Sequence, residues 1–338
     1  APIVGPVAGG TLCDIASWRW VFFINVPAAI FCAIAAMRLL KKFEPKLQKV
    51  PIDVVGLILL VVWVGSLQIM LDEGKNADWF SSVEIRILGI IALIGFICFI
   101  AWELTERHPI VDLKVFRHKG FLFCVLTMVM AYASFMATGV LTPLWLQTFM
   151  GYTSTWSGVV SASGGVLAVI TAPFAAVLMH KVDGRKLVFI GVAWMALCTF
   201  VRGFAAINID IFQITWPILL QGIGVPLFFV SLTAISLSSV LPEETASAAG
   251  LQSFLRTLGG AFATSMVTTE WDARINSSFA QAVGNVDANH AAANAMLSQG
   301  MNKIAVVRVL AGQLQAQSVM IATNQLFTLL AILLFVSS

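Results

Sequence analysis

Arg256 is the one ionisable side chain that the sequence places near the middle of an apolar stretch, ten residues after Ala246. At about 1.5 Å per residue it would lie about 15 Å deep in a bilayer. A charge at that depth is costly, so it should face protein or a water-filled cavity and pair with an acid or with carbonyl oxygens. Asp53, Glu103 and Glu270 all lie near the ends of apolar stretches. Two roles remain open for Arg256: a structural ion pair or hydrogen-bond hub, and a part in coupling.

The sequence lacks the common signatures of a membrane enzyme. It contains no HExxH, GxSxG or GxxxxGK[ST] motif and no pair of acids inside an apolar stretch. Its five cysteines have no CxxC spacing, and no group of His, Cys and acids stands at metal-ligand spacing. We therefore expect no enzyme, no catalytic residue and no metal site. Basic residues lie in short loops rather than on one face, which does not indicate a nucleic-acid partner.

The elements that must position Arg256 are membrane helices. Hydrophobic residues make up 59% of the chain and charged residues 11%, where a soluble domain carries about 25% charged residues. A span needs roughly 20 apolar residues. We therefore predict an all-α, polytopic membrane helix bundle with a partial span ending near Leu12 and nine further runs: Trp20–Leu40, Val54–Leu71, Ile85–Trp102, Phe121–Met150, Gly158–Met179, Leu187–Ala206, Trp216–Leu241, Ala246–Thr269 and Val319–Val336.

Basic residues predict the orientation of these spans. Lys and Arg collect in one alternating set of loops, which the positive-inside rule assigns to the cytoplasm. The opposite short loops are acidic and should face outside, and alternation places the polar segment Trp271–Gln317 on that side. The basic set comprises Arg38, Lys41, Lys42, Lys46, Lys49, Arg107, Lys114, Arg117, Lys119, Lys181, Arg185 and Lys186.

The first ten residues predict a helix built for close packing. Ala1, Gly5 and Gly9 recur at every fourth position, so one helix face carries no side chain larger than a methyl group. Pro6 removes a backbone donor and should bend the helix. We expect this face to form a seam against a helix of the carboxy-terminal half. Gly164, Ala168 and Ala172 predict a second close-packing helix.

Gly5, Pro6, Gly9, Gly10 and Asp14, followed by W-R-W, F-F and I-N-V-P, resemble the antiporter motif of major facilitator drug exporters, which lies on their fifth helix. Later runs are similar to the fourteen-span branch of that superfamily. The chain is identified by this resemblance as a drug:proton antiporter of the fourteen-span family and as a fragment that starts in the fifth span. The later runs are Gly65–Asp72, Trp79–Ser82 and Pro109–Leu113.

The resemblance implies the major facilitator fold, here about nine full spans plus part of one. Residues 1–40 would end the amino-terminal six-helix bundle. Residues 41–120 would hold two extra linker spans and cytoplasmic loops. Residues 121–338 would form the carboxy-terminal six-helix bundle, including a periplasmic loop at 271–317.

Several residues are candidates for a substrate cavity. Aromatic and Met side chains within a span could form the apolar wall of a binding site, or they could contact lipid or the core of the bundle. Gln147 could be a capping amide or a substrate contact, and Gln221 could form an interhelical hydrogen bond or line a pocket. Near Gln221, two glycines and a proline should weaken the helix locally. The candidates are Phe135, Met136, Gln147, Gln221, Phe228 and Phe229.

Two cytoplasmic loops carry residues that could have a function. Asp183, Arg185 and Lys186 lie in a degraded form of the facilitator loop that acts as a cytoplasmic latch, and a cytoplasmic anchor is the safer interpretation. His108 and His118 flank another cytoplasmic loop, and we expect both to be solvated.

The resemblance implies a secondary active transporter of the bacterial inner membrane that expels lipophilic drugs and toxic compounds by alternating access. It would use the proton gradient and no cofactor, with the proton-carrying acid in amino-terminal helices that precede this stretch. Its partners would be lipophilic substrates, the lipid bilayer, a periplasmic adaptor docking on 271–317 and an outer-membrane channel. Alternatives are a facilitator-type exporter of a metabolite, siderophore or lipid, and a non-transporting membrane scaffold.

Overall fold

The apolar runs form helices throughout the computed structural model, which describes residues 2–40, 53–106, 109–206, 209–288 and 302–338. No strand occurs among these residues, as expected for an all-α protein. The α-helices are α1 (Val4–Ile15), α2 (Trp20–Phe23), α3 (Asn25–Leu40), α4 (Val54–Glu73), α5 (Val83–Thr105), α6 (Lys119–Thr148), α7 (Ser154–Met179), α8 (Gly184–Arg202), α9 (Ile211–Ser238), α10 (Thr245–Ala288) and α12 (Lys303–Val336).

Eight helices among the described residues are long and apolar enough to cross a membrane, counting α2 and α3 as one. They match eight of the nine predicted runs. The ninth run, Ala246–Thr269, lies inside α10, whose Gln, Arg, Ser and Thr residues make it less apolar than the others. The polytopic membrane bundle is therefore confirmed.

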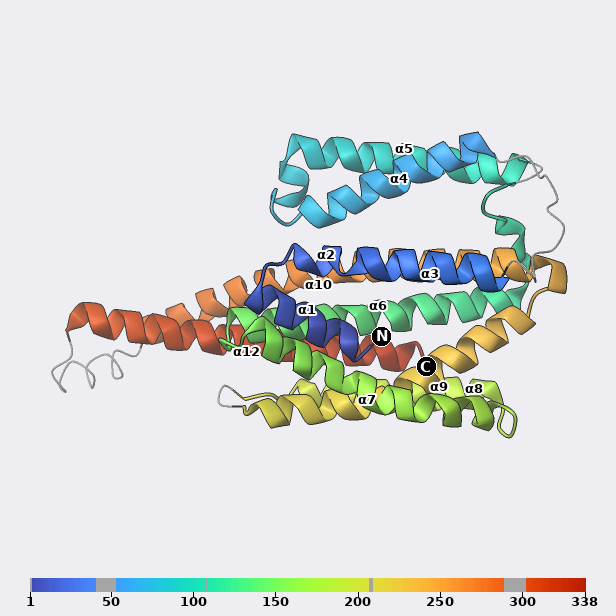
Figure 1. The fold of residues 1–338 in the computed structure, drawn as a ribbon. Helices are drawn as coiled ribbons and strands as arrows, with labels where there is room; N and C mark the ends of the chain where they lie inside the picture. The colour runs from blue at the N-terminus through green and yellow to red at the C-terminus, as the bar shows by residue number, and fades with distance from the viewer. Residues whose placement is uncertain (1, 41–52, 107–108, 207–208, 289–301) are drawn as a thin grey trace.

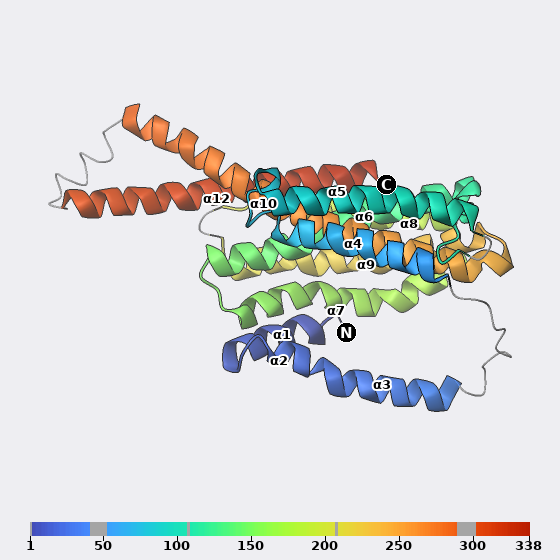
Figure 2. The same cartoon turned by 90° about the horizontal axis from the view of Figure 1, so that it is seen from above.

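Figures 1 and 2 show the helices lying side by side, with α6 to α10 and α12 forming the main bundle. Helix α1 packs on α7 at one edge, and α2 and α3 follow on the outside of α1. The α4–α5 hairpin packs on α10. We call the end that holds the α1–α2 and α6–α7 connections the outer end, following the loop-charge prediction, and the opposite end the inner end.

Glycines set the approach of α1 to α7. A methyl group on Gly10 would collide with the carbonyl oxygen of Ser154, and one on Gly158 would collide with that of Pro6. Added Cβ atoms at Gly5 and Gly9 would meet no atom of the described residues within 4 Å. The predicted contact with the carboxy-terminal half exists, but the predicted face was wrong by one residue: Pro6 and Gly10 form the seam. Ala1 lies outside the described residues.

Glycines also bring α9 close to both of its neighbours. A Cβ atom on Gly222 would collide with the carbonyl oxygen of Gly164 in α7, and one on Gly224 would approach the carbonyl oxygen of Gly191 in α8 to 2.6 Å. The helix runs without a break from Ile211 to Ser238 and includes Pro226. The local weakening predicted around Gln221 is therefore not seen as an interruption. These glycines serve close packing instead.

Large side chains fill the space between α6, α8, α9 and α12. Met128, Val192, Met195, Phe228 and Leu334 are each fully buried and belong to one cluster. Burying apolar side chains between helices in this way excludes voids and gives each helix a defined position. Phe228 is therefore part of the core.

The α4–α5 hairpin has an apolar outer surface and polar attachments to α10. Its exposed side chains are predominantly Val, Ile, Leu and Phe, which suits contact with lipid. Ser265 of α10 donates a hydrogen bond to the carbonyl oxygen of Leu71 at 2.7 Å. Lys75 and Asp272 form an ion pair at 2.7 Å. The hairpin is thus held to the main bundle near its outer end.

The predicted polar segment 271–317 is largely helical where the structure describes it. Helix α10 continues to Ala288 and α12 begins at Lys303, and both project beyond the other helices (Figures 1 and 2). Trp271 is buried, and its indole N–H donates to the hydroxyl of Thr323 at 2.9 Å. Residues 289–301 lie outside the described residues.

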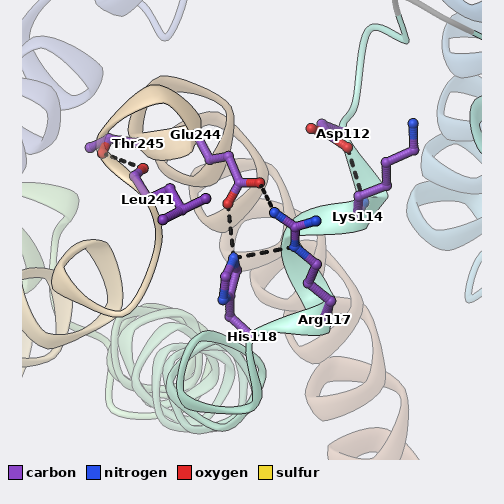
Figure 3. A network of polar contacts seen from close by, with 7 residues as sticks. All are labelled: Asp112, Lys114, Arg117, His118, Leu241, Glu244 and Thr245. Atoms are coloured by element: carbon purple, nitrogen blue, oxygen red, sulfur yellow. Dashed lines mark hydrogen bonds and ion pairs between the residues drawn. The ribbon is translucent and has the colours of Figure 1, made fainter.

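At the inner end, one carboxylate joins two loops. Glu244 accepts a hydrogen bond from Arg117 at 2.7 Å, and His118 Nε2 lies 2.9 Å from its other oxygen (Figure 3). His118 was expected to be a solvated loop residue; that was wrong, because the loop before α10 brings Glu244 against it. His108 and residues 41–52 lie outside the described residues.

Candidate substrate cavity and outer latch

A cavity of about 300 Å³ lies between α1, α6, α7 and α9 and the end of α8. One part of its wall is apolar and includes Phe135, Ile218 and Val225, and another part is polar. Pockets of this kind, mostly apolar with a few placed polar groups, are typical of small-molecule sites. The polar lining comprises Thr138, Thr142, Ser161, Arg202 and Gln221.

The hydroxyl groups in the cavity wall donate to their own helices. Thr138 donates to the carbonyl oxygen of Phe135 at 2.8 Å, Thr142 to that of Thr138 at 2.7 Å, and Ser161 to that of Ser157 at 2.9 Å. This back-bonding is common for Ser and Thr inside helices. With their protons engaged, these hydroxyls offer oxygen lone pairs rather than donors to the cavity.

Arg202 is the charged residue of the cavity lining. It ends α8, its side chain is buried, and its Nη2 donates a hydrogen bond to Thr142 Oγ1. The guanidinium carbon lies 4.2 Å from the centre of the Phe327 ring, within the range of a cation–π interaction. The sequence analysis did not single out this residue, because it stands at the end of an apolar run, next to an outer loop.

Gln221 fulfils both roles left open for it. Its Nε2 donates to the hydroxyl of Thr199 in α8 at 3.2 Å, so it forms an interhelical hydrogen bond. It also lines the cavity beside Arg202. Burial of an amide without such a partner would be costly, and the bond to Thr199 therefore fixes the position of this side chain in the wall.

The structure brings together two of the six predicted cavity residues. Phe135 and Gln221 line the cavity. Phe228 lies in the core, Phe229 packs against Tyr132, Phe135 and Phe228, and Met136 lies beside Gly260 of α10. Gln147 is exposed at the outer end, where it bridges α6 to α7 through Ser154 and Ser157. These four side chains are outside the lining.

Arg256 stands against aromatic rings instead of an acid. Its guanidinium carbon lies 5.2 Å from the Tyr132 ring centre and 5.9 Å from that of Phe229. Its Nε is buried without a hydrogen-bond partner, and no carboxylate of the described residues forms an ion pair with it. The structure therefore gives this charge a cation–π environment.

Asp14 joins α1 to α7 at the outer end. Its carboxylate accepts hydrogen bonds from the backbone N–H groups of Ser154 and Thr155, at 3.2 and 2.7 Å, and from the Thr155 hydroxyl at 2.6 Å. The first N–H groups of a helix lack intrahelical partners, so a carboxylate there is a favourable cap. We call these contacts, with the Pro6 and Gly10 seam, the outer latch.

The inner loop before α8 has a simpler geometry. Asp183 caps α8 by accepting a hydrogen bond from the N–H of Arg185 at 3.0 Å. Arg185 and Lys186 are exposed. Among the described residues neither forms an ion pair. The cytoplasmic anchor therefore stays a prediction for this loop.

An all-α bundle of apolar helices, with a cavity walled by α1 on one side and by the later helices on the other, is the architecture of a membrane transporter. Residues 1–264 match the Major Facilitator Superfamily, and the chain belongs to that family. The family is one of transporters, not enzymes. The membership confirms what the motif around Gly5, Pro6 and Asp14 predicted.

Three relatives are similar along nearly the whole chain. "Multidrug export protein EmrB" of Escherichia coli (strain K12) is 40% identical over 332 residues, which is 97% of this chain and 65% of that protein. "Fatty acid resistance protein FarB" of Neisseria gonorrhoeae is 37% identical, covering 99% of this chain and 67% of that protein. EmrB of Haemophilus influenzae is 34% identical, covering 98% and 66%. The chain thus spans about two thirds of these relatives' length.

Among solved structures, a bacterial homologue of the human lysosomal transporter Spinster, in an inward-facing and occupied conformation, superposes with a TM-score of 0.46. Its sequence is 14% identical, and the superposition covers 99% of this chain and 80% of that one.

Proposed function

We propose that this chain is the greater part of a proton-coupled secondary transporter of the bacterial inner membrane that exports lipophilic, toxic compounds by alternating access. The observation that carries the proposal is the cavity between α1 and the later helices, together with the outer latch beside it. A cavity held shut at one end by contacts between two helix groups is what alternating access requires. The names of the similar multidrug export proteins support the export of drugs.

The division of the chain follows the family. Residues 1–40 would belong to the amino-terminal bundle, 41–120 to the linker spans, and 121–338 to the carboxy-terminal bundle. In the structure, α1 meets α7 through backbone-to-backbone contacts at Gly10 and Gly158. Such a contact between the two bundles would slide or separate when the transporter changes state. Residues 271–317 would bind a periplasmic adaptor protein, which would connect to an outer-membrane channel.

Proton coupling is proposed from the family. The described lining of the cavity contains Arg202 and no Asp or Glu. An arginine stays protonated near neutral pH and cannot exchange a proton there. The proton-carrying acid would therefore belong to a part of the complete protein outside this lining, and no cofactor would be needed.

The test is transport by the complete protein reconstituted in vesicles. A lipophilic fluorescent dye should be expelled when a pH gradient is imposed, and a proton ionophore should stop the expulsion. Expulsion that continues in the presence of the ionophore would refute proton coupling but would still be consistent with an exporter. Absence of transport for dyes, fatty acids and siderophores alike, in folded protein, would favour the scaffold alternative.

A further inference from the structure

Arg202 is a buried cation whose neighbours are neutral. Only 8% of its surface is exposed, and its neighbours are the Thr142 hydroxyl and the face of Phe327. No carboxylate of the described residues forms an ion pair with it. A guanidinium has five N–H donors, and Thr142 satisfies one of them. Burying such a charge without an anion is costly.

The Arg202 side chain lines two neighbouring pockets. It lines the cavity of about 300 Å³ described above and a second, outer pocket of about 310 Å³ that includes Trp145, Phe204 and Gln213. The described residues that line the two spaces include no Asp or Glu. The potential in both spaces is therefore set by the guanidinium, which favours a negative group.

The other polar groups of the cavity are less suited to binding a negative group. The hydroxyls of Thr138 and Ser161 donate to backbone carbonyls, and the amide N–H of Gln221 donates to Thr199. The two hydroxyls therefore present lone pairs to the cavity, and Gln221 keeps a single neutral N–H beyond its bond to Thr199. Arg202 is the strong donor of the described lining, and it stands beside an apolar wall.

We propose that the cavity binds an amphipathic organic anion. Its carboxylate or similar oxoanion would pair with Arg202, and its apolar body would lie against Phe135, Ile218 and Val225. The fork of a guanidinium matches a carboxylate and forms charge-assisted hydrogen bonds that are stronger than neutral ones. The inference rests on the proposed export function and names the substrate class of the same site.

The test compares two probes of equal shape on the complete protein in lipid nanodiscs. Dansylaminoundecanoic acid should bind at least about tenfold more tightly than its uncharged amide, because charged hydrogen bonds are worth more than neutral ones. Arg202→Gln should lower the affinity for the acid to that of the amide and leave the amide unchanged. Arg86→Gln, which alters an arginine outside both spaces, should keep the tenfold preference.

A second variant tests the location. Gly139 lines the cavity, and a Cβ atom there would meet nothing within 4 Å. Gly139→Leu should therefore fill the cavity and weaken the acid and the amide alike. Acid binding that survives Gly139→Leu would place the probe elsewhere and overturn the site.

The remaining outcomes separate this inference from the export function. Equal affinity of the unaltered protein for the acid and the amide would overturn the anion site. If Gly139→Leu then weakened the binding of both probes, the cavity would still bind lipophilic compounds, and the proposed export function would be unaffected. Should Arg202→Gln fail to fold, Thr142→Val removes the neutral partner and keeps the cation. The preference for the acid must then persist, and its loss would show that the charge does not select the ligand.

Discussion

The carboxylate of Asp14 accepts a hydrogen bond from the backbone N–H of Thr155 at 2.7 Å. This bond joins α1 to the first turn of α7, although the two residues are far apart in the sequence. Thr153, the N-cap residue of α7, satisfies a different N–H, that of Trp156. The first turn of α7 is thus capped jointly from within and from α1. A cap supplied by another helix is lost when the two helices separate, so this contact favours the state in which the outer end is closed.

The first prediction concerns this cap. Asp14→Ala should open the outer end more often, because the N–H groups of Ser154 and Thr155 lose the acceptor that α1 supplies. A cysteine at Gly139, in a background without the five native cysteines, reports on access to the cavity. Its reaction with an impermeant thiol reagent added outside should speed up accordingly. Asp183→Ala removes a cap of similar geometry within the inner loop and should leave the rate unchanged. An equal increase in both variants would refute the latch.

The second prediction compares two adjacent glycines. Gly10→Ala should destabilise the protein by about 1–3 kcal/mol, the usual cost of overpacking, because its methyl group would strike the backbone of Ser154. Gly9→Ala should change stability by less than about 0.5 kcal/mol, since nothing lies within 4 Å of the added atom. Thermal unfolding of the complete protein measures both. An equal loss of stability in the two variants would instead support the seam that the sequence predicted, which includes Gly9.

That seam shows what spacing can and cannot predict. Small residues at every fourth position correctly indicated a close-packed helix, but Gly5 and Gly9 lie one residue away from Pro6 and Gly10, which repeat at the same interval. Two adjacent faces of one helix thus carry the same signal. The choice between them depends on Gly158 of α7, which is far away in the sequence.

Arg202 shows the same limit for the cavity. Its charge was visible, but a residue at the end of an apolar run can turn toward solvent or back into the bundle. The inward turn depends on Thr142 and Phe327, which come from α6 and α12. Conversely, the spans, the seam helix and Gln221 were predictable because long apolar runs, glycine spacing and a buried amide each have few structural solutions.

A third prediction concerns Arg256. If its main stabilisation comes from the Tyr132 ring, a double-mutant cycle of Arg256→Met and Tyr132→Leu should give a coupling of about 0.5–2 kcal/mol in unfolding free energy. A parallel cycle with Phe149→Leu, whose ring packs on Trp271 instead, should give a coupling near zero. If the changes in unfolding free energy caused by Arg256→Met and Tyr132→Leu simply add, the Tyr132 ring does not stabilise the charge.

A fourth prediction concerns the inner end. Glu244→Gln removes the acceptor shared by Arg117 and His118 and should lower unfolding free energy by about 0.5–1 kcal/mol, as for partly exposed pairs. Glu243→Gln changes the exposed neighbour, which forms no hydrogen bond or ion pair with the described residues, and should have almost no effect. Melting temperatures at low and high salt provide the check, because screening should shrink the difference between the variants.

The last prediction tests the orientation on which the outer latch depends. Gln315 is an exposed residue in the part of α12 that was predicted to lie outside the membrane, and Lys181 is exposed in the basic loop between α7 and α8. In a cysteine-free background, Gln315→Cys should react with an impermeant thiol reagent in intact cells, whereas Lys181→Cys should react only after the membrane is opened. The basic loops favour this orientation because translocating clustered Lys and Arg is unfavourable. The opposite labelling pattern would place Asp14 at the cytoplasmic end, and the contact between α1 and α7 would then close the inner side of the transporter.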